Sequence, residues 1–168
     1  MHRADTGAAR NLRVNVRRAR AGEARALSVL ALESKQHWGY SPRDIERWRS
    51  ELGISNDEIE AYPTFVAETG EAIAGFYSLV PKAEAWVLEH FWVSPKFNRR
   101  GVGRALLQHA SDTARAAGAS AIAIDADPHA EPFYVACGAI REGAIAAPIA
   151  DDPQRTRPQL VLRIGSAG

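Results

Sequence analysis

The sequence predicts a mixed α/β fold, in which helices pack against one sheet that holds both antiparallel and parallel strand pairs. Two strand-like segments, residues 64–68 and 72–79, are joined by Thr-Gly-Glu, as in an antiparallel hairpin. Residues 86–93, 101–117 and 121–125 have the patterns of a strand, a helix and a strand, and such a crossover joins parallel strands. The length of 168 residues fits a single domain.

The N-terminal part of the chain predicts one strand and two helices. Residues 12–17 alternate apolar and polar side chains, which is the pattern of a half-buried strand. Residues 21–37 carry apolar side chains at helical spacing until a glycine and a proline interrupt the pattern. Residues 42–52 fit a second helix with Ser41 as its N-cap. Residues 53–63 are ambiguous and allow a short helix.

The C-terminal part predicts a long helix, a buried strand, a short helix and a last strand. The long helix, residues 101–117, has an apolar stripe and is followed by Gly118, which suits a left-handed helix cap. The short helix should end near Cys137, with Pro132 in its first turn because proline has no N–H to donate. Residues 159–164 are predicted as the last strand.

The composition is that of a globular domain, with 46% hydrophobic and 24% charged residues, which excludes collagen, coiled coil and general disorder. Cys137 is the one cysteine, so no intramolecular disulfide can form and we expect a cytoplasmic protein. The net charge of +1 argues against a nucleic-acid partner or a membrane surface. The longest segment without a charged side chain, residues 72–81, is shorter than the roughly 20 residues of a membrane-spanning helix.

Residues 1–11 are predicted to be a flexible tail, and residues 12–168 to form the single domain. The start of the chain is rich in arginine and poor in acidic residues, a composition that resembles a transit peptide. It has no apolar core or cleavage site, so it does not fit a secretory signal.

The segment Asn98-Arg99-Arg100-Gly101-Val102-Gly103-Arg104 lies between a predicted strand and a predicted helix. The first turn of a helix has unpaired N–H groups and a partial positive charge, and glycines let a phosphate approach the backbone. Arginines there are unfavourable by roughly 0.3–1 kcal/mol each unless an anion offsets them. No acidic residue lies between Glu89 and Asp112 to do so. The segment predicts a polyanion site; a turn with solvated arginines is the alternative.

Two common phosphate-binding motifs are excluded at this segment. The chain has no Gly-Lys-Ser or Gly-Lys-Thr triplet, which a P-loop requires. Leu106 occupies the place of the third glycine in the dinucleotide-binding fingerprint.

The chain resembles the GNAT superfamily of N-acetyltransferases in element order over residues 12–164 and in motif detail over residues 86–140. The motifs are Leu-Glu-His-Phe-Trp-Val-Ser-Pro at residues 88–95, Arg-Gly-Val-Gly at residues 100–103, and Phe133-Tyr134 with Gly138-Ala139. Ser-Lys-x-x-Trp-Gly-Tyr at residues 34–40 and Asp-Pro-x-Ala-Glu-x-Phe-Tyr at residues 127–134 resemble a group of small bacterial members.

The resemblance implies a GNAT-like fold, with a central, mostly antiparallel sheet, a splayed parallel strand pair and about four helices. It implies acetyl-CoA as the cosubstrate in the gap between those strands. The pantetheine arm would follow the backbone of residues 91–93, and the pyrophosphate would lie on backbone N–H groups of residues 99–104. The implied cofactor-binding residues are Phe91, Trp92, Val93, Asn98, Arg99, Arg100, Gly101, Val102, Gly103, Arg104, Asp127, Ala130 and Phe133.

The chain departs from the family pattern at three positions. Asn98 stands where the family motif usually begins with Gln or Arg, and Asp127 replaces the usual Asn ahead of the last helix. His129 stands where close relatives prefer Asn. Because Asn98 is shorter while backbone donors remain, we expect weaker binding of the cosubstrate rather than its loss.

Acetyl transfer to an amine requires a neutral amine, a polarised thioester carbonyl and protonation of the departing thiolate. The resemblance assigns the last task to Tyr134, and polarisation to a backbone N–H near residues 91–93. Glu89 is the leading candidate for proton removal, because a carboxylate in mid-strand is costly unless used or paired. His90 is second, because imidazole titrates near neutral pH. The two should face opposite sides of the sheet unless a bulge intervenes, so the choice stays open.

Glu33, His37, Trp38 and Tyr40 are expected at the acceptor pocket, because in the resembled fold the first two helices help to form its wall. Aromatic rings there could hold a cationic amine, and a packed aromatic cluster is the alternative. His109 is expected on the exposed face of its helix, and no His, Cys or Asp spacing indicates a metal site.

The predicted function is an acetyl-CoA-dependent N-acetyltransferase that acts on a primary amine of a small molecule, by direct transfer in a ternary complex. The alternatives are a lysine or N-terminal protein acetyltransferase, a non-catalytic acyl-CoA-binding module, and an enzyme that acetylates charged tRNA. The near-neutral charge opposes a large RNA partner. Homodimers are frequent in the resembled family, and no membrane partner is expected.

Overall fold

The structure is a computed structural model that describes residues 12–165, so the tail predicted over residues 1–11 lies outside the described part. Its strands are β1 (Asn15–Arg18), β2 (Thr64–Thr69), β3 (Ala72–Val80), β4 (Ala85–Val93), β5 (Ala121–Asp125), β6 (Ile140–Ala146) and β7 (Thr156–Arg163). Its helices are α1 (Ala24–His37), α2 (Pro42–Leu52), α3 (Asn56–Ala61), α4 (Val102–Ala116) and α5 (Glu131–Ala136), with a 3-10 turn η1 (Pro95–Phe97).

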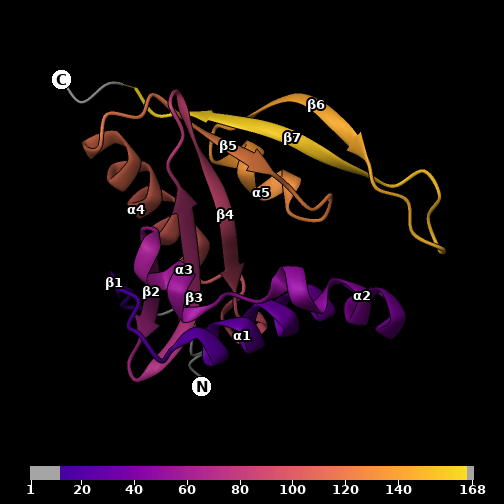
Figure 1. Ribbon diagram of the computed structural model, residues 1–168, viewed down its shortest axis with the longest axis horizontal. Coiled ribbons are helices and arrows are strands. Elements are labelled where there is room, and N and C mark those ends of the chain that lie inside the picture. The colour runs from indigo at the N-terminus through magenta and orange to yellow at the C-terminus, as the bar shows by residue number, and fades with distance from the viewer. Residues whose placement is uncertain (1–11, 166–168) are drawn as a thin grey trace, which may run out of the picture.

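The strands form one mixed sheet in the order β1-β2-β3-β4-β5-β7-β6 (Figure 1). Neighbouring strands are antiparallel except for β4 and β5, which are parallel. This confirms the mixed α/β fold and the strand–helix–strand unit that the sequence predicts. Five α-helices are present in the described residues, against the four or so expected, because the ambiguous segment does contain the short helix α3.

The strand β6 was not predicted from the sequence, and β7 begins at Thr156, three residues before the predicted strand. All seven residues of β6 are exposed, so its sequence lacks the apolar alternation that marks a half-buried strand. The strand exists because it pairs with β7, which is a tertiary contact that local pattern does not report.

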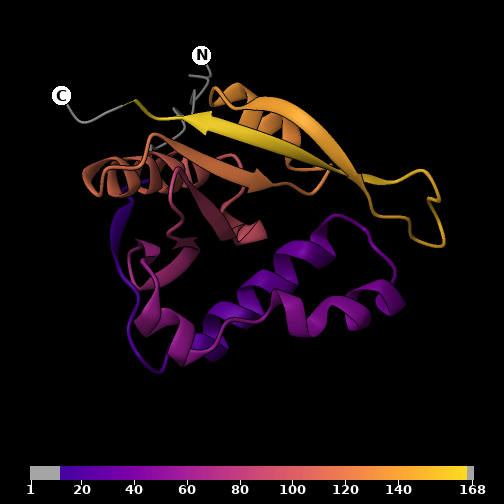
Figure 2. The same cartoon turned by 45° about the horizontal axis from the view of Figure 1, so that its top comes forward.

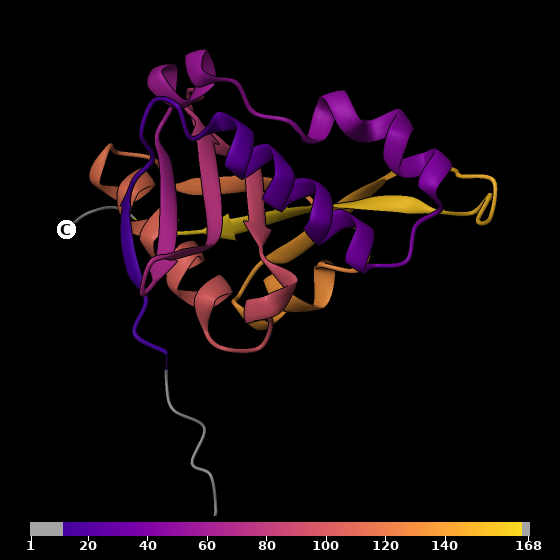
Figure 3. The same ribbon diagram turned by 90° about the horizontal axis from the view of Figure 1, so that it is seen from below.

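Helices cover both faces of the sheet, and each face has its own core. On one face, Leu27 and Leu30 of α1 pack in a cluster with Phe76 of β3. On the other face, Leu106 of α4 packs in a cluster with Tyr77 of β3. Figure 3 shows α1 in front of the strands β3 and β4, with α4 on the far side of the sheet.

His109 is not on an exposed face, contrary to the expectation from the sequence. Its Nδ1 lies 2.7 Å from the Tyr77 hydroxyl oxygen, and its ring packs 4.6 Å from the ring of Phe65. The aromatic side chains of β2 and β3 extend far enough to cover the edge of α4.

Strand β4 has a bulge in its middle. Ser78 of β3 lies opposite His90, whereas the next residue, Leu79, lies opposite Leu88, so Glu89 is the extra residue. Leu88 therefore joins the core under α4, and the His90 ring packs 5.8 Å from the Phe76 ring on the α1 face.

The parallel pair β4–β5 separates soon after it begins. Its register runs from Ala85 opposite Ala121 to Val87 opposite Ala123, although β4 continues to Val93 and β5 to Asp125. The splayed pair implied by the resemblance is present. Backbone groups of β4 beyond Val87 face this gap without a β5 partner, which leaves them free to bind an extended chain.

Gly75 lets β3 and β4 approach closely, so Gly75→Ala should destabilise the protein. A Cβ at this position would lie 2.6 Å from the Trp92 carbonyl oxygen and 2.9 Å from Leu106 Cδ1, and the backbone oxygen cannot move away easily. We expect the free energy of unfolding to fall by about 2 kcal/mol in urea denaturation. Gly143→Ala in β6 is the matched control, because no atom lies within 4 Å of its added Cβ. Equal effects of the two substitutions would contradict the packing argument.

Candidate active site

A cavity of about 610 Å³ lies where β4 and the segment after β5 separate. Residues from the end of α1, the second half of β4, the turn before α4, and α5 line it. They are Ser34, His37, Trp38, Phe91, Trp92, Val93, Phe97, Asn98, Arg99, Gly101, Gly103, Arg104, His129, Ala130, Phe133 and Tyr134. The structure therefore brings together most of the residues that the sequence predicts for cosubstrate and acceptor binding.

One end of the cavity is the N-terminus of α4. Its N-cap Gly101 has a φ of 85°, a left-handed conformation that glycine adopts at little cost, and the helix has no side-chain cap and no acidic residue in its first turn. The N–H groups of the first turn of any helix have no partner within the helix. They face the cavity together with the side chains of Arg99 and Arg104, so this end attracts an anion.

Gly103 fits this helix end against α5. A Cβ at this position would lie 3.1 Å from Cε2 of Phe133, so a larger residue would push the aromatic ring or the helix away. The Phe133 ring in turn stacks 5.7 Å from Phe91 of β4. The free helix end, the unpaired β4 backbone and this apolar wall fit a ligand with a diphosphate and an extended amide-containing arm.

Three predicted cofactor residues do not line the cavity with their side chains. Val102 is buried in the core under α4, and Arg100 is exposed. Asp127 is also outside the lining residues, because its carboxylate is engaged in a polar network. The first two can still contribute backbone N–H groups, whereas the Asp127 side chain has other partners.

Tyr134 lies in α5 at the wall of the cavity and is 5% exposed. Its ring packs 5.7 Å from Phe91 and 5.3 Å from Phe133. Burial raises the pKa of Tyr134, so the phenol stays protonated at neutral pH. Within residues 12–165 its hydroxyl forms no hydrogen bond, which leaves it available as a donor to a bound molecule.

The two residues predicted to remove a proton lie away from the lining of the cavity. Glu89 is exposed at the bulge of β4. His90 is 7% exposed, and burial against the α1 face lowers its pKa, so its imidazole is neutral. Their roles remain predictions.

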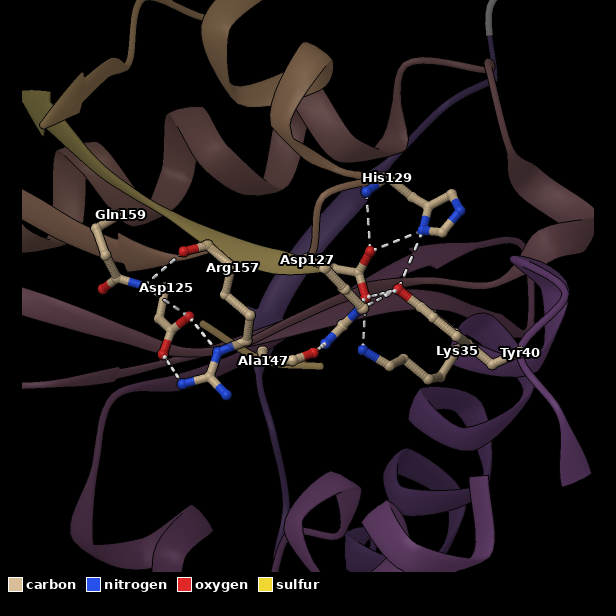
Figure 4. A network of polar contacts seen from close by, with 9 residues as sticks. Lys35, Tyr40, Asp125, Asp127, His129, Ala147, Arg157 and Gln159 are labelled. Atoms are coloured by element: carbon tan, nitrogen blue, oxygen red, sulfur yellow. Dashed lines mark hydrogen bonds and ion pairs between the residues drawn. The ribbon is translucent and has the colours of Figure 1, made fainter. Parts of the chain in front are cut away.

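A buried polar network centred on Asp127 includes His129, which lines the cavity (Figure 4). Its Oδ2 accepts hydrogen bonds from Lys35 Nζ at 2.6 Å, from the Tyr40 hydroxyl at 2.8 Å and from Arg155 Nη2 at 3.3 Å. Its Oδ1 accepts from the His129 backbone N–H at 2.8 Å and lies 2.9 Å from His129 Nδ1.

Burial alone would raise the pKa of Asp127, but the Lys35 ammonium and the His129 N–H groups hold it below its usual value. Burial also lowers the pKa of Lys35, and the Asp127 charge opposes that shift. Burial raises the pKa of Tyr40 to about 12, so its hydroxyl remains a donor. The network therefore holds an ionised carboxylate between two cations.

The residues predicted for the acceptor pocket divide into two groups. His37 and Trp38 line the cavity, whereas Glu33 is exposed on α1 and Tyr40 is engaged with Asp127. The sequence analysis did not identify Lys35, although it lies inside the quoted Ser-Lys-x-x-Trp-Gly-Tyr segment.

Arg155 was also missed, and no local pattern marks it. It lies 28 residues after Asp127, between β6 and β7, and its guanidinium lies 5.2 Å from the Trp48 ring of α2. Figure 2 shows the α1–α2 pair and the β6–β7 hairpin as two arms that extend to the same side of the molecule. The contacts of Arg155 connect these two arms.

In residues 12–165, no group of three or more His, Cys, Asp or Glu side chains is close enough to hold a metal ion. Over the same residues, no helix has the length and apolar character needed to cross a membrane.

A splayed parallel strand pair beside a free helix N-terminus and a buried phenol defines an acyltransferase architecture. Residues 27–139, which are more than half of the chain, match the acetyltransferase (GNAT) family. The chain belongs to this family, as the sequence motifs indicated. No significant match was found among curated proteins.

Solved structures of similar fold support the same architecture. PaiA N-acetyltransferase from Thermoplasma acidophilum, solved with coenzyme A, is 18% identical, with 90% of this chain and 99% of that chain covered and a TM-score of 0.74. The ribosomal-protein-S18-alanine N-acetyltransferase from Escherichia coli is 19% identical over 93% and 97% of the chains, with a TM-score of 0.69. YncA from Salmonella typhimurium, solved with acetyl-CoA, is 15% identical over 93% and 96%, with a TM-score of 0.68.

Asp127→Asn should strongly destabilise the protein, because it leaves Lys35 and Arg155 buried without a counter-charge. We expect the free energy of unfolding at pH 7 to fall by about 3–5 kcal/mol in urea denaturation. Asp125→Asn is the matched control, because its partner Arg157 is 42% exposed, and an exposed pair contributes less than about 1 kcal/mol.

The same two variants, Asp127→Asn and Asp125→Asn, test how the free energy of unfolding depends on pH. Because the pKa of Asp127 is lowered on folding, its stabilising effect is present above the unfolded pKa of about 3.9 and is lost as the pH falls through the lower, folded value. This part of the acid destabilisation should be missing in Asp127→Asn and retained in Asp125→Asn. An equal loss of stability at low pH in the two variants would contradict the lowered pKa of Asp127 in the folded protein.

Proposed function

We propose that the protein transfers the acetyl group of acetyl-CoA to a primary amine on a small molecule, by direct transfer in a ternary complex. The observation that carries this proposal is one cavity that joins the free N-terminus of α4 to the buried Tyr134 hydroxyl. Family membership supplies the reaction class, and two structures of similar fold were solved with coenzyme A or acetyl-CoA.

The residues of the cavity suit the parts of this cosubstrate. First-turn N–H groups of α4, with Arg99 and Arg104, would hold the diphosphate. The unpaired backbone of β4 would hold the amide groups of the pantetheine arm as an added strand does. Phe91 and Phe133 would pack against the apolar part of that arm.

Tyr134 would protonate the departing thiolate. Because burial raises its pKa, the phenol carries its proton at neutral pH and can donate it to the sulfur as negative charge develops there. A backbone N–H of residues 91–93 would polarise the thioester carbonyl, as in other acyl transfers through an oxyanion.

The acceptor would bind at the end of the cavity formed by His37, Trp38 and Trp92. The rings of Trp38 and Trp92 lie 6.2 Å apart at an angle of 43°, and indole faces attract cationic amines. The volume of about 610 Å³ has room for a cosubstrate arm and a small acceptor.

The test is release of free thiol from acetyl-CoA by the purified protein with a panel of primary amines, including amino acids, polyamines and arylamines, and with peptides that carry a free N-terminus or lysine. We expect turnover with at least one small amine. Turnover with peptides alone would replace the small-molecule proposal by a protein acetyltransferase. Tight binding of acetyl-CoA without turnover on any acceptor would show that the protein is a non-catalytic acyl-CoA-binding module.

Tyr134→Phe should slow thiol release, because it removes only the hydroxyl proton donor. We expect kcat to fall by about 100-fold, the usual effect of losing an acid catalyst, while the dissociation constant of coenzyme A measured by calorimetry stays the same. Unchanged kcat in the variant would show that the phenol does not donate the proton.

Arg104→Gln should weaken coenzyme A binding, because it removes a charge that lines the cavity beside the N-terminus of α4. A charged hydrogen bond to phosphate contributes roughly 1.5–3 kcal/mol, so we expect the dissociation constant in calorimetry to rise by about tenfold or more. Arg25→Gln, an equal charge change on the exposed start of α1, serves as the control. Similar weakening in both variants would show only a long-range charge effect.

A further inference from the structure

His129 lies at the wall of the cavity, on the segment that connects β5 to α5. Its ring stacks on Trp38 at 5.5 Å with an interplanar angle of 12°, and it meets the ring of Tyr40 edge-on at 5.3 Å and 86°. Although the side chain is 47% exposed, two aromatic contacts in different planes hold its orientation.

The contacts of His129 determine which ring nitrogen carries the proton. Nδ1 lies 2.9 Å from Asp127 Oδ1 and 3.2 Å from the Tyr40 hydroxyl oxygen. An ionised carboxylate only accepts hydrogen bonds, and the Tyr40 hydroxyl donates its own proton to Asp127 Oδ2. Nδ1 therefore carries a hydrogen, and in the neutral ring the lone pair is on Nε2.

The other ring nitrogen, Nε2, has no hydrogen-bond partner among the described residues. Figure 4 shows it on the side of the imidazole that points away from Asp127. The lone pair is therefore free at a side chain that lines the cavity beside Trp38.

Asp127 is held so that one of its oxygens serves His129 alone. Lys35, Tyr40 and Arg155 all bond to Oδ2, whereas both contacts of Oδ1 are with His129. A carboxylate fixed in this way orients an imidazole, as in other Asp–His pairs.

We propose that His129 is the general base of the transfer, and that Asp127 is the residue that positions it. The inference rests on the proposed function. Nε2 of His129 accepts one proton from the ammonium group of the acceptor, and the freed lone pair of the nitrogen attacks the thioester carbonyl carbon.

The step balances in atoms and charge. The C–N bond forms and the C–S bond breaks, Tyr134 supplies a proton to the sulfur, and a second proton leaves the nitrogen as the amide forms and restores the phenol. The proton on His129 passes to water. The sum is ammonium plus thioester giving amide, thiol and one proton.

Two other candidates are less well placed than His129. The imidazole of His90 is buried against Phe76 on the α1 face, and Glu89 lies at the bulge outside the cavity lining. The charged and titratable groups that face His129 are Asp127 and Tyr40, with Lys35 and Arg155 behind them.

The first experiment compares His129→Gln, Glu89→Gln and His109→Gln in the thiol-release assay with an amine that the wild-type protein acetylates. We expect kcat/KM at pH 7 to fall by about 100-fold in His129→Gln and by less than about twofold in His109→Gln. His109 is the matched control because its Nδ1 also contacts a tyrosine hydroxyl, outside the cavity. A large loss in Glu89→Gln with none in His129→Gln would overturn the proposal.

A second measurement separates a base from a merely structural side chain. The same amine with fluorine on its β-carbon is a stronger acid as the ammonium ion, so it is more often neutral at pH 7 and needs less help from a base. The loss of kcat/KM in His129→Gln should therefore be much smaller for the fluorinated amine. An equal loss for both amines would overturn the assignment of His129 as a base.

A third measurement does not depend on turnover. The ¹⁵N chemical shifts of the His129 ring, identified by their absence in His129→Gln, should report a hydrogen on Nδ1 and none on Nε2 in the neutral ring. A hydrogen on Nε2 would overturn the positioning by Asp127. If the wild-type protein acetylates no amine while these shifts are as expected, the proposed function fails and the orientation of His129 stands.

Discussion

The parting of β4 and β5 after Val87 is the constraint on which the rest of the site depends. Parallel strands normally satisfy each other's backbone groups along their whole length, and here the pairing ends although both strands continue. The unpaired edge of β4 then forms one wall of a cavity whose other walls are helix ends and loops. Gly103 and Phe133 are in contact distance across this gap, and they link the helix after β4 to the helix after β5.

The second structural centre is the Asp127 carboxylate. It connects α1, the β5–α5 segment and the loop before β7 through Lys35, His129 and Arg155. A buried carboxylate between two cations contributes little to stability over an apolar equivalent, but removing one partner is costly. The Asp127 carboxylate beside the cavity is therefore better explained by the way it orients its neighbours. Among these neighbours, His129 lines the cavity and has a ring nitrogen without a hydrogen-bond partner among the described residues.

The sequence alone located most of the fold and the helix end that we propose binds the cosubstrate. Periodicity identified the long helix α4, the hairpin β2–β3 and the buried strand β5 because each carries a strong local pattern. The free N-terminus of α4 could be recognised because Gly101, Gly103 and the absence of acidic residues are adjacent in sequence. The strand β6 could not, because its residues are all exposed and only pairing with β7 defines it.

The sequence by itself determined the family, most of the element order and the uncapped N-terminus of α4, because each of these depends on contiguous residues. Only the tertiary structure decided which polar side chains meet. The bulge at Glu89 places Leu88 and His90 on opposite faces of the sheet, and Arg155 reaches Asp127 from 28 residues away. The tautomer of His129 likewise follows from its contacts with Asp127 and Tyr40. No local sequence pattern encodes such contacts, because they depend on the distances between side chains of separate elements.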